Sequence, residues 1–302
     1  MINVLITTST FNKNILKKLL LKKNFKIITN KMGKKVDYNF LKKNISGIDV
    51  IIAGTEVYDE KILKLAINLK AIYRIGVGTD NINLVFCKKN NIKVFTSKTD
   101  LSTGVAEHAI GLILSAIKKI VEFDKNVKNK KWKKQSTNLL SNKKIGIIGF
   151  GKIGKKIYEL LKPFKLKYFY NDEKRSNYLN IKFKSIKELF KICDVITVHL
   201  PLNKKTNRII NKKIFNQSNP NIILVNTSRG EVINEMDLAN FLSKNKKSIA
   251  ALDVFQKEPY VGKLQKLHNI ILTPHVSGYS QELRSQMENE AIDKIIQKFS
   301  EK

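Results

Sequence analysis

The chain has 302 residues and 42% of them are hydrophobic, which is enough for two packed domains and too apolar for a disordered protein. The longest strongly apolar stretch, AIGLILSAI at residues 109–117, is too short to span a membrane, and the N-terminus lacks the basic segment and apolar core of a signal peptide. The formal net charge of +32 would suggest nucleic acid as a partner, but lysine pairs are spread along the whole chain and Lys, Asn and Ile share codons rich in A and T, so we expect no nucleic-acid and no membrane partner.

The first part of the chain alternates short apolar runs with amphipathic stretches, which is the pattern of βαβ units with a parallel sheet. A long helix with a Ser or Thr N-cap is predicted at residues 102–123, and the lysine-rich run KNVKNKKWKK at 125–134 is expected to form a solvated helix end and loop. Before that helix, strands are predicted at residues 2–7, 25–29, 50–54, 69–75 and 92–96.

A second series of strands follows the lysine-rich loop. An amphipathic helix at about 280–299 closes the chain, and no internal repeat or low-complexity linker is evident. The fold class expected is therefore α/β, with two Rossmann-like domains that each contain a parallel sheet. The strands of this second series are predicted at residues 144–149, 167–171, 195–200, 222–228, 249–255 and 270–274.

The segment GFGKIG at residues 149–154 matches the pattern G-x-G-x-x-G between a predicted strand and a predicted helix. In this context the glycines allow a tight turn, and backbone N–H groups at the helix N-terminus can bind a pyrophosphate. Asp172 ends the next strand, 18 residues after Gly154. A carboxylate there can accept hydrogen bonds from the adenosine ribose and repel a 2'-phosphate, so the expected cofactor is NAD in preference to NADP.

Polar residues also gather at the predicted ends of the later strands. His199 and Pro201 follow one strand, Arg229 follows the next, Asp253 lies near the end of another and His275 follows the last. Ligands of open α/β sheets bind outside the carboxyl ends of the strands, so these side chains are expected beside the nicotinamide. Only five of the 57 basic residues are arginines, which suggests that the arginine here supplies a bidentate fork for a carboxylate.

The two cysteines bear on the cellular compartment and on metal binding. Cys87 and Cys193 lie far apart and lack the spacing of metal ligands. We therefore expect no disulfide framework and no metal site, and a reducing, cytoplasmic setting fits this usage.

Seven motifs are spread over nearly the whole chain: RIGVGTDNIN (74–83), TGVAEHAIGLIL (103–114), GIIGFGKIG (146–154), VITVHLPL (195–202), NTSRGEVI (226–233), ALDVFQKEP (251–259) and LTPHVSGYS (272–280). Together these motifs resemble those of the D-isomer-specific 2-hydroxyacid dehydrogenases, and most of all those of the short D-3-phosphoglycerate dehydrogenases. The resemblance implies a flavodoxin-like substrate-binding domain of residues 1–98, completed by the C-terminal helix 281–302. It implies an NAD-binding Rossmann domain of residues 99–280, and a homodimer to which the long helix from residue 102 contributes.

In that family an arginine, a glutamate and a histidine act together, and the matching residues are Arg229, Glu258 and His275. Oxidation of a 2-hydroxy acid needs a base for the hydroxyl proton, a cation for the carboxylate and a partner that orients the base. His275 would be the base and Arg229 the fork. Glu258 would fix the tautomer of the imidazole and favour its protonated form during reduction.

The resemblance also implies the residues that contact the ligands. His108, on the long helix, is expected at packing or subunit contacts. Substrate contacts are expected from Arg74, Val77 and Gly78. Cofactor contacts are expected from Thr103, Gly149, Gly151, Lys152, Ile153, Gly154, Asp172, His199, Pro201, Thr206, Thr227 and Asp253.

We therefore predict an NAD-dependent oxidoreductase that acts on a small anionic D-2-hydroxy acid and its 2-oxo acid. The pair 3-phosphoglycerate and phosphohydroxypyruvate, of serine biosynthesis, is favoured because Arg74 could hold the phosphate; alternatively, Arg74 braces the glycine-rich loop around Gly76 and Gly78. A hydroxypyruvate or glyoxylate reductase is the alternative substrate assignment. A non-catalytic, NAD-sensing scaffold is the alternative from another class.

Overall fold

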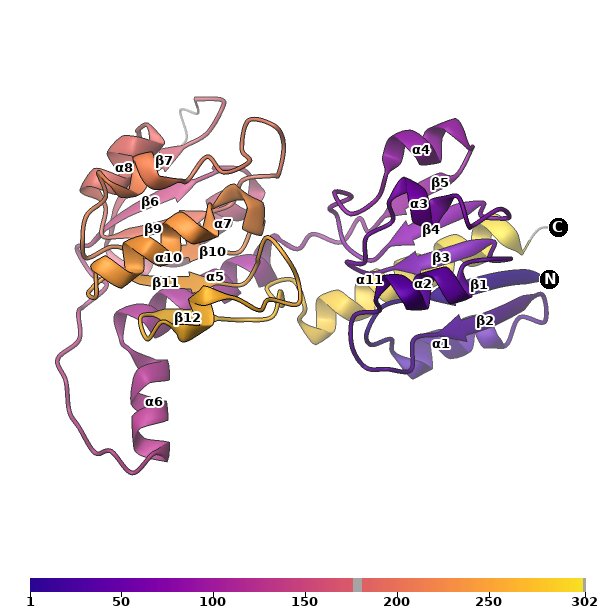
Figure 1. Ribbon diagram of the computed structural model, residues 1–302, viewed down its shortest axis with the longest axis horizontal. Helices are drawn as coiled ribbons and strands as arrows, with labels where there is room; N and C mark the ends of the chain where they lie inside the picture. The colour runs from indigo at the N-terminus through magenta and orange to yellow at the C-terminus, as the bar shows by residue number, and fades with distance from the viewer. Residues whose placement is uncertain (176–180, 301–302) are drawn as a thin grey trace. The chain divides into compact units, whose positions relative to one another are not determined.

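The computed structural model describes residues 1–175 and 181–300 and divides into two compact α/β units (Figure 1). Unit 1 comprises Met1–Asp100 and Gln281–Lys302, and unit 2 comprises Leu101–Ser280. The break after Asp100 lies two residues beyond the boundary expected from the sequence. Each unit contains one sheet in which every pairing between described strands is parallel, so the predicted fold class is confirmed.

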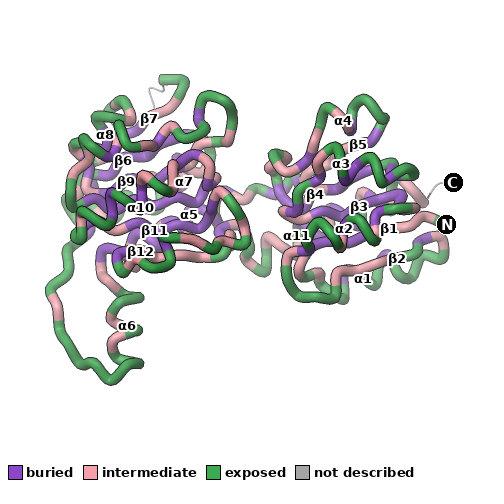
Figure 2. Tube along the Cα trace, in the orientation of Figure 1, coloured by how far each residue is buried: buried purple, intermediate pink, exposed green. Residues whose placement is uncertain are grey.

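The sheet of unit 1 has the order β2-β1-β3-β4-β5, which is the flavodoxin-like order. Its central strand β3 is buried at every position, as expected for a strand covered on both faces (Figure 2). The strands lie at the predicted places: β1 (Ile2–Ile6), β2 (Phe25–Thr29), β3 (Val50–Ala53), β4 (Ala71–Arg74) and β5 (Lys93–Thr96). The helices of unit 1 are α1 (Lys13–Leu20), α2 (Tyr38–Asn44), α3 (Glu60–Leu63), α4 (Leu84–Lys89) and α11 (Gln281–Phe299).

Helix α11 joins unit 1 through two glutamates as well as an apolar face. The buried carboxylate of Glu288 accepts hydrogen bonds from the backbone N–H of Asn12, at 2.9 Å, and from Arg284 Nη2, at 2.6 Å. Glu290 accepts from the hydroxyl of Thr99, at 2.9 Å, and from the backbone N–H of Lys98, at 2.8 Å. The last helix of the chain is therefore fastened both to the segment before α1 and to the segment after β5. Its buried apolar residues are Met287, Ala291, Ile292 and Ile295.

The sheet of unit 2 has the order β12-β11-β10-β9-β6-β7-β8, so the direction of winding reverses between β6 and β9, where Rossmann folds bind their ligands. The short strand β8 was not predicted, because two residues carry no periodicity. The strands are β6 (Lys144–Ile148), β7 (Lys167–Asn171), β8 (Lys182–Phe183), β9 (Val195–Val198), β10 (Ile223–Asn226), β11 (Ile249–Leu252) and β12 (Ile270–Leu272). The helices are α5 (Ser102–Ile117), α6 (Ile120–Lys128), α7 (Lys152–Leu161), α8 (Ile186–Ile192), α9 (Lys212–Phe215) and α10 (Glu235–Lys244), with 3-10 turns at Lys162–Phe164, Gly230–Val232 and Lys263–Lys266.

The prediction of one helix over residues 102–123 with a Ser or Thr N-cap is wrong. Helix α5 ends at Ile117, and α6 begins at Ile120 after Lys119, which adopts a left-handed conformation with φ +52°. The N-cap residue of α5 is Leu101, whose side chain makes no capping hydrogen bond. The apolar residues after the break continued the helical pattern in the sequence, but they do not continue the buried stripe of α5.

Helix α6 and the following segment extend away from the rest of unit 2 (Figures 1 and 2). No residue of α6 is buried, although Ile120, Phe123 and Val127 fall on one helical face. Trp132, in the segment after the helix, is 81% exposed. This projection therefore presents apolar and basic side chains together.

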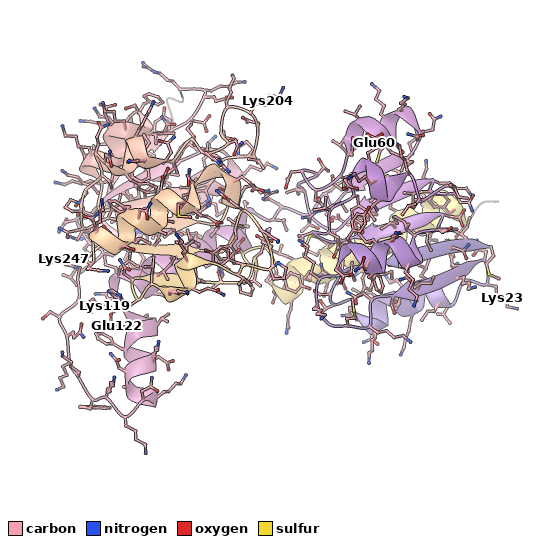
Figure 3. All side chains as sticks on the ribbon, viewed as in Figure 1. Lys23, Glu60, Lys119, Glu122, Lys204 and Lys247 are labelled. Atoms are coloured by element: carbon pink, nitrogen blue, oxygen red, sulfur yellow. The ribbon has the colours of Figure 1, made fainter. Side chains whose placement is uncertain are left out.

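Lysine side chains project from many elements of both units (Figure 3). Lys23 follows α1 in unit 1, and in unit 2 Lys204 lies in the loop after β9 while Lys247 lies in the loop before β11. The positive charge is thus distributed over separate loops and helices of each unit.

The loop between β6 and α7 depends on glycine at two positions. Gly149 has φ +89°, and a Cβ there would lie 2.5 Å from the carbonyl oxygen of His199. A Cβ on Gly154 would overlap the carbonyl oxygen of Gly149. At Gly151, by contrast, an added Cβ would meet no heavy atom within 4 Å, and the residue has φ −77°. The middle glycine therefore borders open space.

This contrast predicts different effects of alanine at two neighbouring glycines. Gly149→Ala should lower the free energy of unfolding by about 2–5 kcal/mol, because it combines a left-handed φ with a clash against rigid backbone. Gly151→Ala, the matched control, should change it by less than about 1 kcal/mol. Urea unfolding followed by circular dichroism measures both, and equal losses in the two variants would contradict this description of the loop.

Candidate active site

The glycine loop, helix α7 and strand β7 lie together where the sequence predicts a dinucleotide site. Helix α7 starts after Gly151, which has no side chain to cap the first N–H groups, so these groups can bind an anion. At the end of β7, Asp172 Oδ2 accepts a hydrogen bond from the backbone N–H of Phe150, at 2.7 Å, and Oδ1 accepts from that of Lys174, at 3.2 Å. The predicted ribose carboxylate is thus fastened to the loop predicted to hold the phosphates.

Two buried polar atoms lie at the carboxyl ends of the neighbouring strands β9 and β10. His199 and Thr227 follow the paired residues Val198 and Asn226. Within residues 1–175 and 181–300, His199 Nδ1 and Thr227 Oγ1 have no hydrogen-bond partner. The other ring nitrogen of His199 lies 2.7 Å from Thr197 Oγ1, and burial lowers the pKa of His199 to about 3, so the ring is neutral at physiological pH. This neutral, polar surface beside the glycine loop fits a bound dinucleotide.

Other predicted cofactor residues differ in what they contact. The hydroxyl of Thr206 donates to the carbonyl of Pro201, at 2.6 Å, and accepts from the N–H of Asn203, at 2.9 Å, so it shapes its own loop. Thr103 is exposed on the first turn of α5. At the start of α7, Lys152 is exposed and the next residue, an isoleucine, is half-buried.

The predicted base and its partner are in contact. His275 Nδ1 lies 2.9 Å from Glu258 Oε2 and 3.1 Å from Oε1. A carboxylate only accepts hydrogen bonds, so Nδ1 carries a proton and Nε2 is left for a ligand. Glu258 Oε1 also accepts from the backbone N–H of Phe255, at 3.1 Å. The two side chains are 29% and 19% exposed, which leaves the pair accessible yet partly shielded from water.

The turn that carries His275 is held by Asp253, which has no exposed surface. Asp253 Oδ1 accepts from Thr273 Oγ1, at 2.6 Å, and from the backbone N–H of Val276, at 2.9 Å, while Oδ2 accepts from that of Ser277, at 2.9 Å. The backbone N–H of His275 donates to the carbonyl of Asp253, at 2.8 Å. Asp253 was predicted to contact the cofactor; the contacts that the structure shows place its carboxylate under the histidine turn.

His108 belongs to the same cluster. Its Nε2 lies 3.2 Å from Thr273 Oγ1 and 3.5 Å from Asp253 Oδ1. The sequence suggested only packing or a subunit contact for this residue. No spacing rule could have revealed the link, because His108 and Thr273 are 165 positions apart.

Arg229 stands at the end of β10 in a loop that packs closely on the loop after β11. A Cβ on Gly230 would overlap the backbone of Phe255, three residues before the glutamate, so only glycine allows this approach. Asn226 Nδ2 donates to the carbonyl of Arg229, at 2.9 Å, and Arg229 Nη1 donates to the carbonyl of Ser228, at 2.7 Å. The arginine as a whole residue is partly exposed.

Glu235, at the start of α10, braces the same loop and was not singled out in the sequence. Its Oε1 accepts from the backbone N–H of Gln256, at 2.6 Å, and Gln256 Nε2 donates to the carbonyl of Ile233, at 2.7 Å. Burial raises the pKa of Glu235, and the nearby carboxylates of Glu231 and Glu258 add to this effect. The only sequence signal for Glu235 was its position in the first turn of a helix.

In unit 1, the predicted substrate residues form a glycine turn after β4. Gly76 has φ +129°, and a Cβ there would overlap the guanidinium of Arg74. Arg74 Nη1 donates to the carbonyl of Ile75, so its side chain folds back over the turn. Val77 is 57% exposed and Gly78 is half-buried. The bracing role considered for Arg74 therefore has a structural basis.

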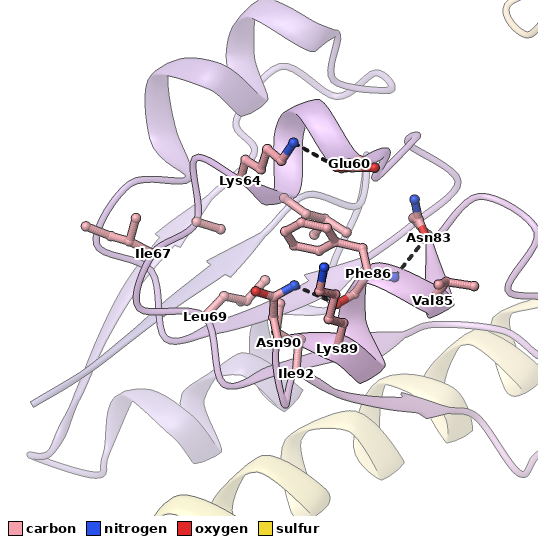
Figure 4. A pocket seen from close by; sticks show the side chains of 12 residues that line it. Glu60, Lys64, Ile67, Leu69, Asn83, Val85, Phe86, Lys89, Asn90 and Ile92 are labelled. Carbon is pink, nitrogen blue, oxygen red and sulfur yellow. Dashed lines mark hydrogen bonds and ion pairs between the residues drawn. The ribbon is translucent and has the colours of Figure 1, made fainter.

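A surface groove of about 910 Å³ lies between α3 and α4 of unit 1 (Figure 4). Its apolar part includes Leu63, Leu69, Phe86 and Ile92, and on its rim Lys64 pairs with Glu60 at 2.7 Å. None of the residues predicted for the site lines this groove.

No helix within residues 1–175 and 181–300 combines the length and the hydropathy needed to cross a bilayer. In the same part of the chain, no three His, Cys, Asp or Glu side chains are grouped so that they could bind a metal ion.

Comparison with known proteins gives the family. A hydroxypyruvate reductase of Thermotoga maritima is 33% identical over 268 residues, which are 86% of this chain and 87% of that protein. A D-3-phosphoglycerate dehydrogenase of Archaeoglobus fulgidus is 33% identical over 241 residues, which are 77% of this chain but 46% of that protein. The crystal structure of an NAD-dependent formate dehydrogenase from Staphylococcus aureus in complex with NAD has a TM-score of 0.88 at 26% identity, covering 100% of this chain and 96% of that chain. Residues 110–277 match the NAD binding domain of the D-isomer specific 2-hydroxyacid dehydrogenases; the chain belongs to this family, and its cofactor is NAD.

Proposed function

We propose that this chain is an enzyme that interconverts a D-2-hydroxy acid and its 2-oxo acid. The observation that carries the proposal is the contact of His275 Nδ1 with Glu258, which leaves Nε2 for a substrate hydroxyl or carbonyl oxygen. When bound, the nicotinamide of NAD accepts or supplies the hydride. His275 takes the hydroxyl proton during oxidation and returns one to the carbonyl oxygen during reduction. Glu258 orients the ring and stabilises its protonated form.

Arg229 is proposed to bind the carboxylate of the substrate. The loop that carries Arg229 packs against the loop that carries Glu258, because Gly230 closely approaches the backbone of Phe255. This contact fixes the position of the arginine loop relative to the Glu258 loop. A planar guanidinium binds a carboxylate through two parallel hydrogen bonds, which a lysine cannot do. That geometry would also select acids over the corresponding uncharged ketones.

The pair 3-phosphoglycerate and phosphohydroxypyruvate is the first candidate for the substrate, with Arg74 proposed to contact the phosphate. Support comes from the use of arginine in a lysine-rich chain and from the similarity to a D-3-phosphoglycerate dehydrogenase. The second candidate is reduction of hydroxypyruvate or glyoxylate. It is favoured by the hydrogen bond from Arg74 to the carbonyl of Ile75 and by the similarity to a hydroxypyruvate reductase over most of both chains.

A homodimer is part of the same proposal, and the projection formed by α6 and residues 129–139 is its most suitable surface. Ile120 and Val127 are 52% and 51% exposed on one face of α6, and Trp132 follows. A second copy of the chain would bury this apolar face. The break after Ile117 means that α6, and not a continuation of α5, would make the contact.

The setting proposed is reducing and cytoplasmic. Cys87 and Cys193 are both buried free thiols. Burial raises the pKa of Cys193 to about 12, and the neighbouring Asp194 contributes in the same direction, so this thiol stays protonated and unreactive.

Removing the base or the fork should abolish most turnover while the cofactor still binds. His275→Ala should lower kcat/KM for 2-oxo acids by about 10²–10⁴-fold, and Arg229→Lys by about 10–150-fold, because the lysine keeps the charge but loses the fork. NADH binding, measured by fluorescence, should survive in both. The exposed His268→Ala and Arg208→Lys serve as controls. A parent protein that binds NADH but turns over no member of a panel of 2-oxo acids would instead identify a scaffold.

Asp172 should make NADH the preferred cofactor. We expect kcat/KM with NADH to exceed that with NADPH by at least about 100-fold, because a carboxylate repels the 2'-phosphate. Asp172→Asn keeps an oxygen for the N–H of Phe150 and should reduce this ratio at least about tenfold. The control is Asp194→Asn, since Asp194 accepts from the N–H of Lys144 at the other end of β6. An unchanged ratio in Asp172→Asn would remove the role assigned to Asp172.

Arg74→Ala separates the two substrate candidates. If Arg74 binds a phosphate, the variant should lose about 10–150-fold in kcat/KM with phosphohydroxypyruvate and little with hydroxypyruvate or glyoxylate, because a charge-assisted hydrogen bond contributes about 1.5–3 kcal/mol. Steady-state kinetics with the three acids decides the matter. Equal losses with all three would show that Arg74 braces the turn around Gly76, and would favour hydroxypyruvate or glyoxylate reduction.

A further inference from the structure

Three side chains connect helix α5 to the turn that carries His275. His108 Nε2 lies 3.2 Å from Thr273 Oγ1, and that hydroxyl lies 2.6 Å from Asp253 Oδ1. The carboxylate of Asp253 then accepts the backbone N–H groups of Val276 and Ser277, each at 2.9 Å. The cluster thus runs from a helix to the backbone directly after the proposed base, entirely within unit 2.

The chemistry of the groups sets the direction of these hydrogen bonds. A carboxylate only accepts, so the proton of the Thr273 hydroxyl points to Asp253. The oxygen of Thr273 can then serve His108 only as an acceptor, and His108 Nε2 must carry a proton. The same nitrogen of His108 also lies 3.5 Å from Asp253 Oδ1, and this second acceptor requires the same proton on Nε2.

The turn needs such support because its backbone is strained. His275 has φ +56°, a left-handed conformation that costs a residue with a side chain about 1–2 kcal/mol. Burial by itself would raise the pKa of Asp253, but hydrogen bonds from His108, Thr273 and the backbone of the turn outweigh it and leave the pKa lowered. Asp253 is therefore a buried anion that keeps its charge because the turn and His108 surround it with donors.

We propose that His108 is a positioning residue of this enzyme: through Thr273 and Asp253 it holds the turn on which His275 meets Glu258. The inference rests on the proposed role of His275 in proton transfer. His108 lies on the face of α5 that meets the carboxyl ends of β11 and β12, where Asp253 and Thr273 stand. A histidine that merely filled space there could be replaced by leucine without effect on the turn.

The test compares His108→Leu, which removes the donor, with His108→Gln, whose side-chain N–H can replace Nε2–H. Hydrogen exchange of a peptide covering residues 273–279, measured by mass spectrometry, reports on the turn without any need for turnover. Loss of one neutral hydrogen bond should speed this exchange by roughly 3- to 10-fold in His108→Leu and lower kcat by a similar factor. The KM for NADH should change less than about twofold, and His108→Gln should restore both exchange and kcat to within about twofold.

Thr273→Val breaks the next link and supplies a double-mutant cycle. If His108 acts through Thr273, the variant carrying both His108→Leu and Thr273→Val should be no worse than the poorer single variant. His268→Leu, at an exposed position, is the matched control and should change neither readout. If His108→Leu fails to fold, Thr273→Ser and Thr273→Val are compared instead. The serine keeps the hydroxyl and the valine removes it, so the pair applies the same test to the link through Thr273.

Unchanged exchange of the turn in His108→Leu, or fully additive losses in the cycle, would overturn the proposal. So would exchange that rises equally in all peptides, since that pattern means a general loss of stability. A parent protein without turnover would refute the proposed function alone, because the exchange measurement would still decide whether His108 holds the turn.

Discussion

The buried carboxylate of Asp253 is the interaction on which the geometry of the site depends. A charge without exposed surface costs several kcal/mol unless donors surround it, and any movement that removes one of these donors costs about 1–3 kcal/mol or more. The donors are the side chains of Thr273 and His108 and the backbone of Val276 and Ser277. The protein therefore tolerates the left-handed conformation of His275. If the turn relaxed to an unstrained backbone, the carboxylate of Asp253 would remain in the interior as a poorly paired anion.

The other two members of the proposed triad are set by backbone contact. Gly230 lets the loop after β10 touch the backbone of the loop after β11, and Glu235 holds that second loop through Gln256. Strand pairing places β10, β11 and β12 side by side, so their carboxyl ends deliver the three loops to one edge of the sheet. Rigid strands thus provide the position of each loop, and short-range contacts provide its orientation.

Much of the fold and of the candidate site could be predicted from the sequence. The features that were missed are those that a local sequence pattern does not encode. Buried parallel strands are nearly continuous apolar runs, so all but the two-residue β8 were visible, although the predicted carboxyl ends ran on into the loops after β9, β10, β11 and β12. Glycine patterns revealed the loop after β6, because Gly149 has a left-handed φ and Gly154 packs against the carbonyl group of Gly149. The end of α5 was missed, since Ile120 and Val121 continue its apolar pattern in a helix that buries nothing.

Contacts between distant positions had no local signature at all. The link from His108 to Thr273, 165 positions apart, depends on tertiary packing, which no spacing encodes. The same is true of Glu288, a residue that reads as an exposed helical glutamate but accepts the backbone N–H of Asn12 from a buried position.

The membership of α11 in unit 1 has a consequence for the order of events during synthesis. Unit 2 is one continuous stretch of chain, so all of its strands leave the ribosome before α11 is made. Unit 1 must wait for the last helix, with the carboxylates of Glu288 and Glu290 still absent and the backbone groups that they bind open to water. Unit 2 can therefore be the first to reach its native state, and unit 1 is completed only after its own strands have existed for the time needed to translate an entire domain.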